Sequence, residues 1–190
     1  MNIGLYFGSF NPIHHGHIAI AEYMYQCFQF DKIWFVVSPS NPLKKEVELL
    51  DEYKRFLLVE TAIKDKSYFI ASDIEFGMEK PSYTYLTLRK IHVEYSQHTF
   101  SIILGSDCLD TISLWKNYEE ILQNYTIYIY PRSEKIDYIP LKNIIYTQPP
   151  LLDVSSNFIR KKIKNKEDIR DFVHSDVFEM IQNNGFYKEE

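Results

Sequence analysis

Cysteine is scarce in this sequence, and its placement predicts neither a disulfide scaffold nor a cysteine zinc cluster. Cys27 and Cys108 are far apart, and no CxxC spacing occurs. Three histidines cluster at residues 14, 15 and 17. A zinc site, however, needs three or four well-placed ligands, and His15 is expected to point elsewhere. Reduced thiols are typical of a cytoplasmic protein, and we expect that location.

Long apolar runs and a broad excess of positive charge are also missing. The longest apolar run, residues 33–37, is far too short to span a bilayer, and no basic segment followed by a long apolar one predicts a signal peptide. The net charge is −5, which argues against a general binder of nucleic acid or anionic membrane. We therefore expect no nucleic-acid and no membrane partner, although a local phosphate site is compatible with this charge.

Three common enzyme motifs are absent as well. The sequence has no GxGxxG, no GxxxxGK[ST] and no GxSxG, which excludes a dinucleotide-binding fingerprint, a P-loop and a serine-hydrolase elbow. What remains is a chain of 190 residues with 45% hydrophobic and 25% charged residues. These values predict a single globular domain over residues 1–190.

The most informative stretch runs from Gly8 to His17 and reads GSFNPIHHGH. It follows a short apolar run at residues 3–7 and precedes apolar residues at helical spacing, so it lies at a strand-to-helix turn. In an open α/β sheet such a turn lies at the carboxyl edge of the strands, where ligands bind, and the helix N-terminus attracts anions. Gly8 allows close approach of the backbone to a ligand. His14 and His17 can donate hydrogen bonds to phosphate oxygens there.

The remaining patterns predict an α/β fold: a Rossmann-like, doubly wound, mainly parallel sheet with helices on both faces. Asp51 is expected to cap a helix over 51–64, in which Tyr53, Phe56, Val59 and Ile63 form one apolar stripe. Arg55 in this helix is compatible with simple surface charge, and no role follows for it. Further strands are expected at 32–37, 68–71, 99–104, 125–130 and 144–147, with helices after residue 82, at 119–124, from residue 155 or 156, and before Asn184-Gly185, the helical part from about 155 to 190 packing on the sheet.

Several polar or aromatic residues follow these strands, and each admits two interpretations. Lys44 and Lys45 lie in a proline-bearing loop and can reach a triphosphate or form a solvated surface pair. Ser82 can cap the next helix, whose free N–H groups can also hold a carboxylate. Asp107 can cap a helix or accept hydrogen bonds from a ribose. Trp115 is a core residue by default.

Two segments carry a resemblance to a known superfamily. The residues His14 to His17 match the (H/T)xGH signature of the nucleotidyltransferases, and Val154 to Arg160, VSSNFIR, resembles their second signature, ISSTxIR. Ser82 to Thr84 (SYT) and Gly105 to Trp115 (GxDxLxxxxxW) resemble the bacterial nicotinate-mononucleotide adenylyltransferases. The chain departs from the second signature where Asn157 replaces a threonine, which removes a hydroxyl that family members aim at the phosphates.

The resemblance implies transfer of the adenylyl group of ATP, with Mg²⁺, to nicotinate mononucleotide, giving nicotinate adenine dinucleotide for NAD synthesis and pyrophosphate. No metal-ligating residues of the protein are implied. The implied catalytic residues are His14, His17, Lys44 and Arg160. The implied ATP-binding residues are Gly8, Ser9, Phe10, His14, His17, Lys45, Gly105, Asp107, Arg132, Ser155, Ser156, Asn157, Phe158, Ile159 and Arg160. Those implied for nicotinate mononucleotide are Ser9, Phe10, Lys44, Ser82, Tyr83, Thr84 and Trp115.

Two other functions stay open at this point. One is another transferase of the superfamily, which would use phosphopantetheine as the acceptor or would use CTP with a phospho-alcohol. The other is a regulator that binds nucleotide without catalysis, which the Asn157 departure supports and the two histidines with Arg160 oppose. The sequence leaves the oligomeric state open, a homo-oligomer included.

Overall fold

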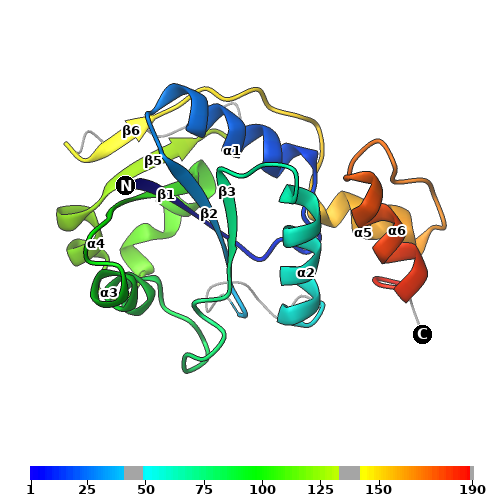
Figure 1. Cartoon of the computed structure of the whole chain (residues 1–190), viewed down its shortest axis with the longest axis horizontal. Coiled ribbons are helices and arrows are strands. Elements are labelled where there is room, and N and C mark those ends of the chain that lie inside the picture. The colour runs from blue at the N-terminus through cyan, green and yellow to red at the C-terminus, as the bar shows by residue number, and fades with distance from the viewer. Residues whose placement is uncertain (41–48, 133–141, 189–190) are drawn as a thin grey trace.

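A six-stranded parallel sheet forms the centre of the molecule, and helices cover both of its faces (Figure 1). The computed structural model describes residues 1–40, 49–132 and 142–188. The strands are β1 (Asn2–Gly8), β2 (Lys32–Val37), β3 (Phe69–Ser72), β4 (Thr99–Gly105), β5 (Thr126–Tyr130) and β6 (Ile144–Tyr146). The helices are α1 (His15–Cys27), α2 (Glu52–Ile63), α3 (Thr84–Glu94), the 3-10 helix η1 (Ser106–Leu114), α4 (Tyr118–Asn124), α5 (Ser156–Lys164) and α6 (Ser175–Asn184).

The strand order β3-β2-β1-β4-β5-β6 confirms the doubly wound fold. The chain winds outward from β1 to β3 on one side and then returns to the other side of β1 with β4. Ligands of open α/β sheets bind at the carboxyl ends of the strands where the winding direction reverses, which here lies between β1 and β4. Register places the ends of the inner strands together, since Gly8 pairs with Val37 and Tyr6 with Ile103. The sheet therefore brings the residues after β1, β2 and β4 to one edge.

Alternation along the strands divides the core into two layers. Tyr6 of β1 and Ile103 of β4 point into the layer that contains residues of α1 and α2. Leu5 and Ile102, one position earlier, point into the layer that contains residues of α3, η1 and α4. Because both faces are covered, the inner strands are continuous apolar runs, as parallel strands usually are.

The two C-terminal helices join the layer of α1 and α2. Ile159 of α5 and Ile181 of α6 are both fully buried in that layer, and α6 packs on α2. Figure 1 shows α5 and α6 beyond α2, at the end of the molecule where the C-terminus lies. Gly185 ends α6 in the left-handed region at φ 66°, as the Asn184-Gly185 pair predicts.

The buried face of helix α2 differs in part from the apolar stripe predicted for it. Asp51 caps this helix as expected, accepting hydrogen bonds from the backbone N–H groups of residues 53 and 54. Tyr53, however, is 60% exposed, while Leu58 is fully buried with Val59 and Ile63. The buried face is rotated relative to the predicted one because it must also receive Arg55, whose side chain is entirely inside the protein.

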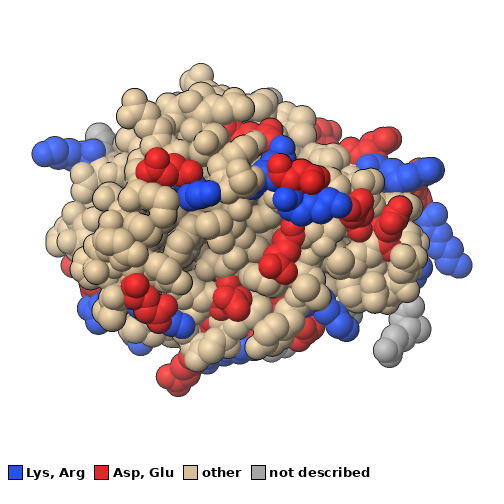
Figure 2. Space-filling model, viewed as in Figure 1, with Lys and Arg blue, Asp and Glu red and all other residues tan. Residues whose placement is uncertain are grey.

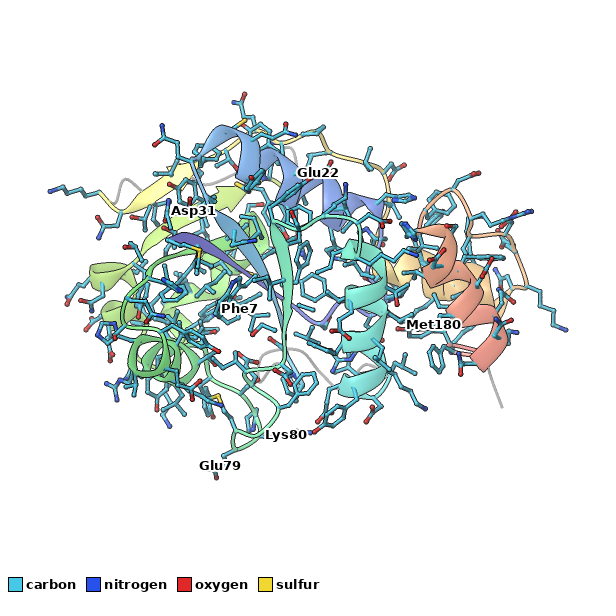
Figure 3. All side chains as sticks on the ribbon, in the orientation of Figure 1. Phe7, Glu22, Asp31, Glu79, Lys80 and Met180 are labelled. Atoms are coloured by element: carbon cyan, nitrogen blue, oxygen red, sulfur yellow. The ribbon has the colours of Figure 1, made fainter. Side chains whose placement is uncertain are left out.

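The surface carries charges of both signs. Lys and Arg side chains lie interspersed with Asp and Glu on the face shown in Figure 2. Figure 3 shows Glu79 and Lys80 at the outer tip of the loop between β3 and α3, and Lys80 forms an ion pair with Glu52 of α2. No helix in the described ranges is long and apolar enough to span a membrane.

Candidate active site

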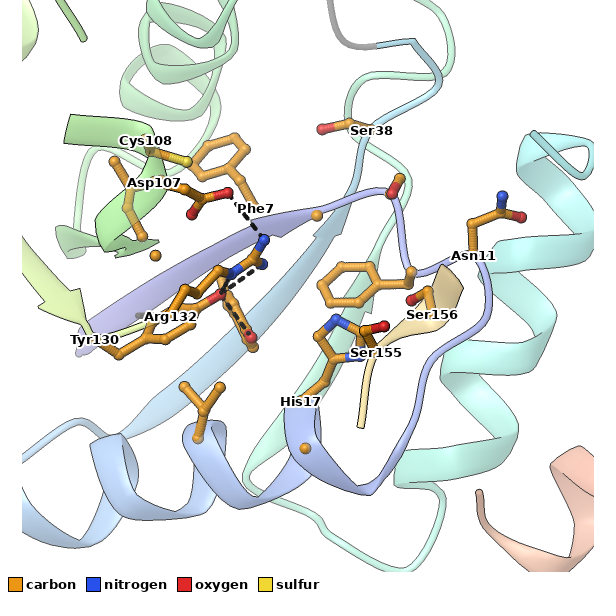
Figure 4. Close-up of a pocket in the computed structure, with 18 of the residues that line it drawn as sticks. Phe7, Asn11, His17, Ser38, Asp107, Cys108, Tyr130, Arg132, Ser155 and Ser156 are labelled. Atoms are coloured by element: carbon orange, nitrogen blue, oxygen red, sulfur yellow. Dashed lines mark hydrogen bonds and ion pairs between the residues drawn. The ribbon is translucent and has the colours of Figure 1, made fainter. Parts of the chain in front are cut away.

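A cavity of about 1130 Å³ lies at the carboxyl edge of the sheet, beside the ends of β1 and β4 (Figure 4). Segments far apart in the sequence line it together. Among the predicted site residues, it is lined by Gly8, Ser9, Phe10, His14, His17, Ser82, Tyr83, Thr84, Gly105, Asp107, Trp115, Arg132, Ser155, Ser156, Asn157 and Arg160. Lys44 and Lys45 lie outside the described residues.

The turn after β1 places the two histidines at the start of α1. His14 is the N-cap residue and His17 the third residue of the helix, as predicted. The backbone N–H of His14 donates to Nδ1 of His17 over 3.3 Å. Because Nδ1 accepts this bond, the proton of a neutral His17 ring sits on Nε2, which can donate to a phosphate oxygen. Figure 4 shows the His17 ring beside the cavity, next to Ser155.

His14 is a neutral side chain in this site. It is 7% exposed, and its ring lies against that of His17 with centroids 3.7 Å apart. Burial, and then the charges of Arg132 and His15, lower the pKa of His14 to about 3. His14 can therefore contribute a hydrogen bond near neutral pH but no positive charge.

The two predicted signatures meet beside the helix start. The hydroxyl of Ser156 donates to the carbonyl of Pro12 over 2.8 Å, and Nη1 of Arg160 donates to the carbonyl of Asn11 over 2.7 Å. Gly16 lies at the contact between the two segments. A Cβ at this residue would be 3.0 Å from the side chain of His14 and 3.1 Å from that of Val154. The middle glycine of HxGH is thus explained by the close approach of the second segment.

The predicted ATP-binding residues at α5 fall into two groups: polar side chains at the cavity and apolar side chains that pack against other apolar residues. Ser155 caps the helix by accepting from the N–H of Phe158 over 3.1 Å, and Asn157 Oδ1 accepts from Nη2 of Arg160 over 3.4 Å. Ile159 instead lies in the core, and the ring of Phe158 packs on Phe172. Since the backbone N–H groups of residues 158 and 159 both donate to Ser155, the nucleotide contacts predicted for these two residues stay predictions.

A polar cluster closes the cavity on the β4 and β5 side. Arg132 donates to Asp107 over 3.1 Å and to the hydroxyl of Tyr130 over 2.9 Å (Figure 4). Asp107 lies in the first turn of η1, but the N-cap residue is Gly105, so the capping interpretation of Asp107 is wrong. With about half of its side chain exposed, Asp107 can still accept hydrogen bonds from a ribose.

We expect Gly105→Ala to weaken ATP binding through this cluster. A Cβ at residue 105 would lie 2.5 Å from Oδ1 of Asp107 and 2.7 Å from Nε of Arg132, so both side chains must shift. Losing about one charged hydrogen bond predicts a roughly tenfold rise in KM for ATP. Gly77→Ala is the matched control, because a Cβ there meets no atom within 4 Å. An unchanged KM in the Gly105 variant would contradict this role of the cluster.

The start of α3 lines the opposite part of the cavity. The N-cap residue is Tyr83 and not Ser82, and the Ser82 hydroxyl donates to the carbonyl of Ser40 over 3.2 Å. The helix has no side-chain cap at its N-terminus, so its first N–H groups are available to a carboxylate. Trp115 is half-buried: it packs against the core layer of α3, η1 and α4 and also lines the cavity.

Glu75 is a residue that the sequence reasoning missed. It lines the cavity, is 2% exposed, and accepts from the hydroxyl of Thr87 over 2.8 Å. Burial raises the pKa of its carboxyl, and hydrogen bonds from Ser82, Thr87 and Ser38 oppose that rise. The available signal was an acid between two apolar residues, Ile74 and Phe76, in a short loop.

We expect Glu75→Gln to make the protein more stable at alkaline pH. Above the ordinary carboxyl pKa of 4.5, the unfolded chain loses the proton that the folded protein keeps, so stability falls as pH rises toward the raised pKa. Glutamine keeps the acceptor for Thr87 and cannot ionise. Thermal melts should show a Tm advantage on the order of 2–4 °C near pH 8 that disappears near pH 4. Glu79→Gln, at an exposed position in the same loop, is the control and should melt like wild type at both pH values. An identical pH dependence of Tm in wild type and the Glu75 variant would refute the explanation.

The fold and the site define a class. A doubly wound sheet whose first strand leads into an HxGH turn, with a serine-capped helix and an arginine at the same cavity, is the arrangement of an α/β nucleotidyltransferase. Residues 5–162 match the family model described as cytidylyltransferase-like.

Comparison with known proteins then identifies the family. The chain is 45% identical over 193 residues to the probable nicotinate-nucleotide adenylyltransferase of Flavobacterium johnsoniae, with all of both chains covered. It is 45% identical over 189 residues to that of Cytophaga hutchinsonii, with 98% of each chain covered. The chain belongs to the nicotinate-nucleotide adenylyltransferase family, which confirms the resemblance drawn from its motifs.

A solved structure supports the fold independently of close sequence similarity. The nicotinic acid mononucleotide adenylyltransferase of Plasmodium falciparum, complexed with NaAD, superposes with a TM-score of 0.82 at 24% identity. The match covers 98% of this chain and 97% of the other. The sheet and its helices are therefore shared along almost the whole length.

Proposed function

We propose that this cavity transfers the adenylyl group of ATP directly to nicotinate mononucleotide, giving nicotinate adenine dinucleotide and pyrophosphate. The observation that carries the proposal is that one cavity is lined by the HxGH turn, by Ser155 to Arg160 and by the start of α3. The first two suit a triphosphate, and the third suits a carboxylate on a pyridine ring. Two relatives at 45% identity are named for this activity.

The reaction needs no nucleophile from the protein. A phosphate oxygen of the mononucleotide attacks the α-phosphorus of ATP, a new P–O bond forms, and the bond from that phosphorus to the leaving oxygen breaks. Pyrophosphate departs with the electron pair. The protein then has to align the two substrates and stabilise the charge on the transferred group.

Side chains at the helix start of α1 supply that stabilisation. Nε2 of His17 donates to the α-phosphoryl group, and neutral His14 adds a second donor. Arg160, anchored through Nη1 to the Asn11 carbonyl, brings a fixed positive charge to the phosphates. Lys44 and Lys45 lie outside the described residues, and the positive charge that they would add stays a prediction.

Magnesium fits this site as an ion carried by ATP. In the part of the chain that the structure describes, no three His, Cys, Asp or Glu residues form a group that could hold a metal. Mg²⁺ keeps several non-protein ligands readily, and the triphosphate oxygens can provide them. When bound, the ion would neutralise charge on the phosphates.

The pyridine ring is assigned to the cavity wall formed by Trp115 and the start of α3. An electron-poor ring can stack on the indole. The N–H groups at Thr84, with Ser82 and Tyr83 nearby, can then hold the ring carboxylate. A carboxamide carries no charge and gains less from a helix N-terminus, which favours nicotinate over nicotinamide.

The test is pyrophosphate release with ATP and Mg²⁺ and three separate acceptors: nicotinate mononucleotide, nicotinamide mononucleotide and phosphopantetheine. Strong preference for the first is expected. Release only with phosphopantetheine would reassign the acceptor. Binding of ATP without release with any acceptor would contradict the proposal and support a regulatory role. A cytoplasmic location and the lack of nucleic-acid or membrane partners stay predictions, and the oligomeric state stays open.

A further inference from the structure

Arg55 of α2 is a buried cation that does not line the cavity. It is 0% exposed, and four hydrogen bonds from it reach backbone carbonyls. Nε donates to Leu50 over 2.7 Å, Nη1 to Ser9 over 2.6 Å and to Ser38 over 2.9 Å, and Nη2 to Pro39 over 3.1 Å. No carboxylate within the described residues forms an ion pair with it by distance. Its partners are therefore backbone dipoles.

These carbonyls belong to the two turns that meet at the sheet edge. Ser9 lies directly after β1, in the turn that leads to the two histidines. Ser38 and Pro39 lie directly after β2. A planar guanidinium has five donors in a fixed geometry and can bind both turns at once, whereas an ammonium is a single point.

A second path of contacts leads from the same side chain to Arg160. Arg55 binds the carbonyl of Leu50, and the N–H of Leu50 donates to Oδ1 of Asn11 over 3.2 Å. The carbonyl of Asn11 in turn accepts from Arg160 over 2.7 Å. Asn11 and Arg160 both line the cavity. Arg55 thus lies behind three groups of the site without touching its contents.

We propose that Arg55 is a positioning residue for adenylyl transfer: it holds the turns after β1 and β2 at one separation and supports the contact between Asn11 and Arg160, so that His14, His17 and Arg160 act on the same triphosphate. This rests on the proposed function. Catalysis depends on alignment of the reacting atoms, and a displacement of about 1 Å can cost about 10²-fold in rate.

The test compares Arg55→Lys with Lys54→Gln, the latter removing a charge from an exposed position on the same helix. Wild-type turnover with ATP and nicotinate mononucleotide is measured first, because its absence would refute the proposed function instead. The lysine variant should then lose about 10²-fold in kcat per folded molecule, with KM for nicotinate mononucleotide within about threefold. The control should match wild type. The inference would be overturned if the lysine variant folds and its kcat is within threefold of wild type. It would also be overturned if the loss of activity equals the loss of folded protein.

A second variant keeps the inference testable if the Arg55 variant does not fold. Asn11→Ala removes the side-chain acceptor of Leu50 and leaves the guanidinium in place. It should lower kcat about tenfold without changing KM for nicotinate mononucleotide. Where both variants fold, their effects should be less than additive, because they break one path of contacts. Wild-type kcat in Asn11→Ala, or fully additive effects, would contradict the path.

Discussion

Replacing His17 with alanine is expected to lower kcat by roughly 10²–10³-fold, the usual cost of removing one aligned donor to a developing negative charge. His17 is placed for this role because it lines the cavity and its Nδ1 accepts from the His14 N–H, which puts the proton of a neutral ring on Nε2. KM for nicotinate mononucleotide should change little, since the proposed function places the ring of that substrate at Trp115 and the start of α3. Steady-state kinetics with each substrate varied in turn gives both numbers.

The matched control is His15→Ala in the same turn. His15 is half-buried and does not line the cavity, and its backbone N–H bond to Phe172 survives the substitution. Its kcat should stay close to that of wild type. Near-normal kcat in the His17 variant would contradict the role of its imidazole. An equal loss in both variants would show that the conformation of the turn matters and not the His17 ring.

Replacing Arg160 with alanine should reduce kcat/KM for ATP by about 10²–10³-fold. Its guanidinium is fixed against Asn11 and Asn157 at the cavity wall, so a bidentate charged donor is lost from the phosphate site. Arg160→Lys should recover only part of this, because an ammonium cannot reproduce two parallel bonds. The measurement is the ATP dependence of pyrophosphate release at saturating mononucleotide.

Lys161→Ala provides the comparison for charge alone. Lys161 is the next residue of α5 and is exposed to solvent, and its replacement removes the same positive charge. Its kcat/KM should fall less than about twofold, because exposed charges are screened. Comparable losses at residues 160 and 161 would mean that the helix acts through its overall charge.

Local patterns predicted the elements that carry the reaction. The apolar run before Gly8 and the helical spacing after His17 define β1 and α1, and Ser155 caps α5 because a serine at that place has a backbone N–H within reach. The topology then followed from parallel strands joined by helices. These signals act within a few residues, which is why one sequence reveals them.

Arg55 and Ser82 show where such reasoning fails. An arginine that follows an exposed lysine in a helix resembles surface charge. Its burial is set by carbonyls at residues 9, 38 and 39, which only the sheet brings together. Ser82 lies one position before the N-cap residue Tyr83, and its hydroxyl donates to the carbonyl of Ser40, which is 42 residues away in the sequence. In both cases a long-range contact decides the role of the side chain.

Direct transfer between two bound substrates is the central claim, and the stereochemistry at the α-phosphorus tests it most directly. ATP carrying sulfur in one configuration at that phosphorus is used with nicotinate mononucleotide, and the configuration of the dinucleotide product is determined. A single in-line displacement predicts inversion. Retention would require two displacements through an adenylylated protein group, and would contradict a site that only aligns substrates and stabilises charge.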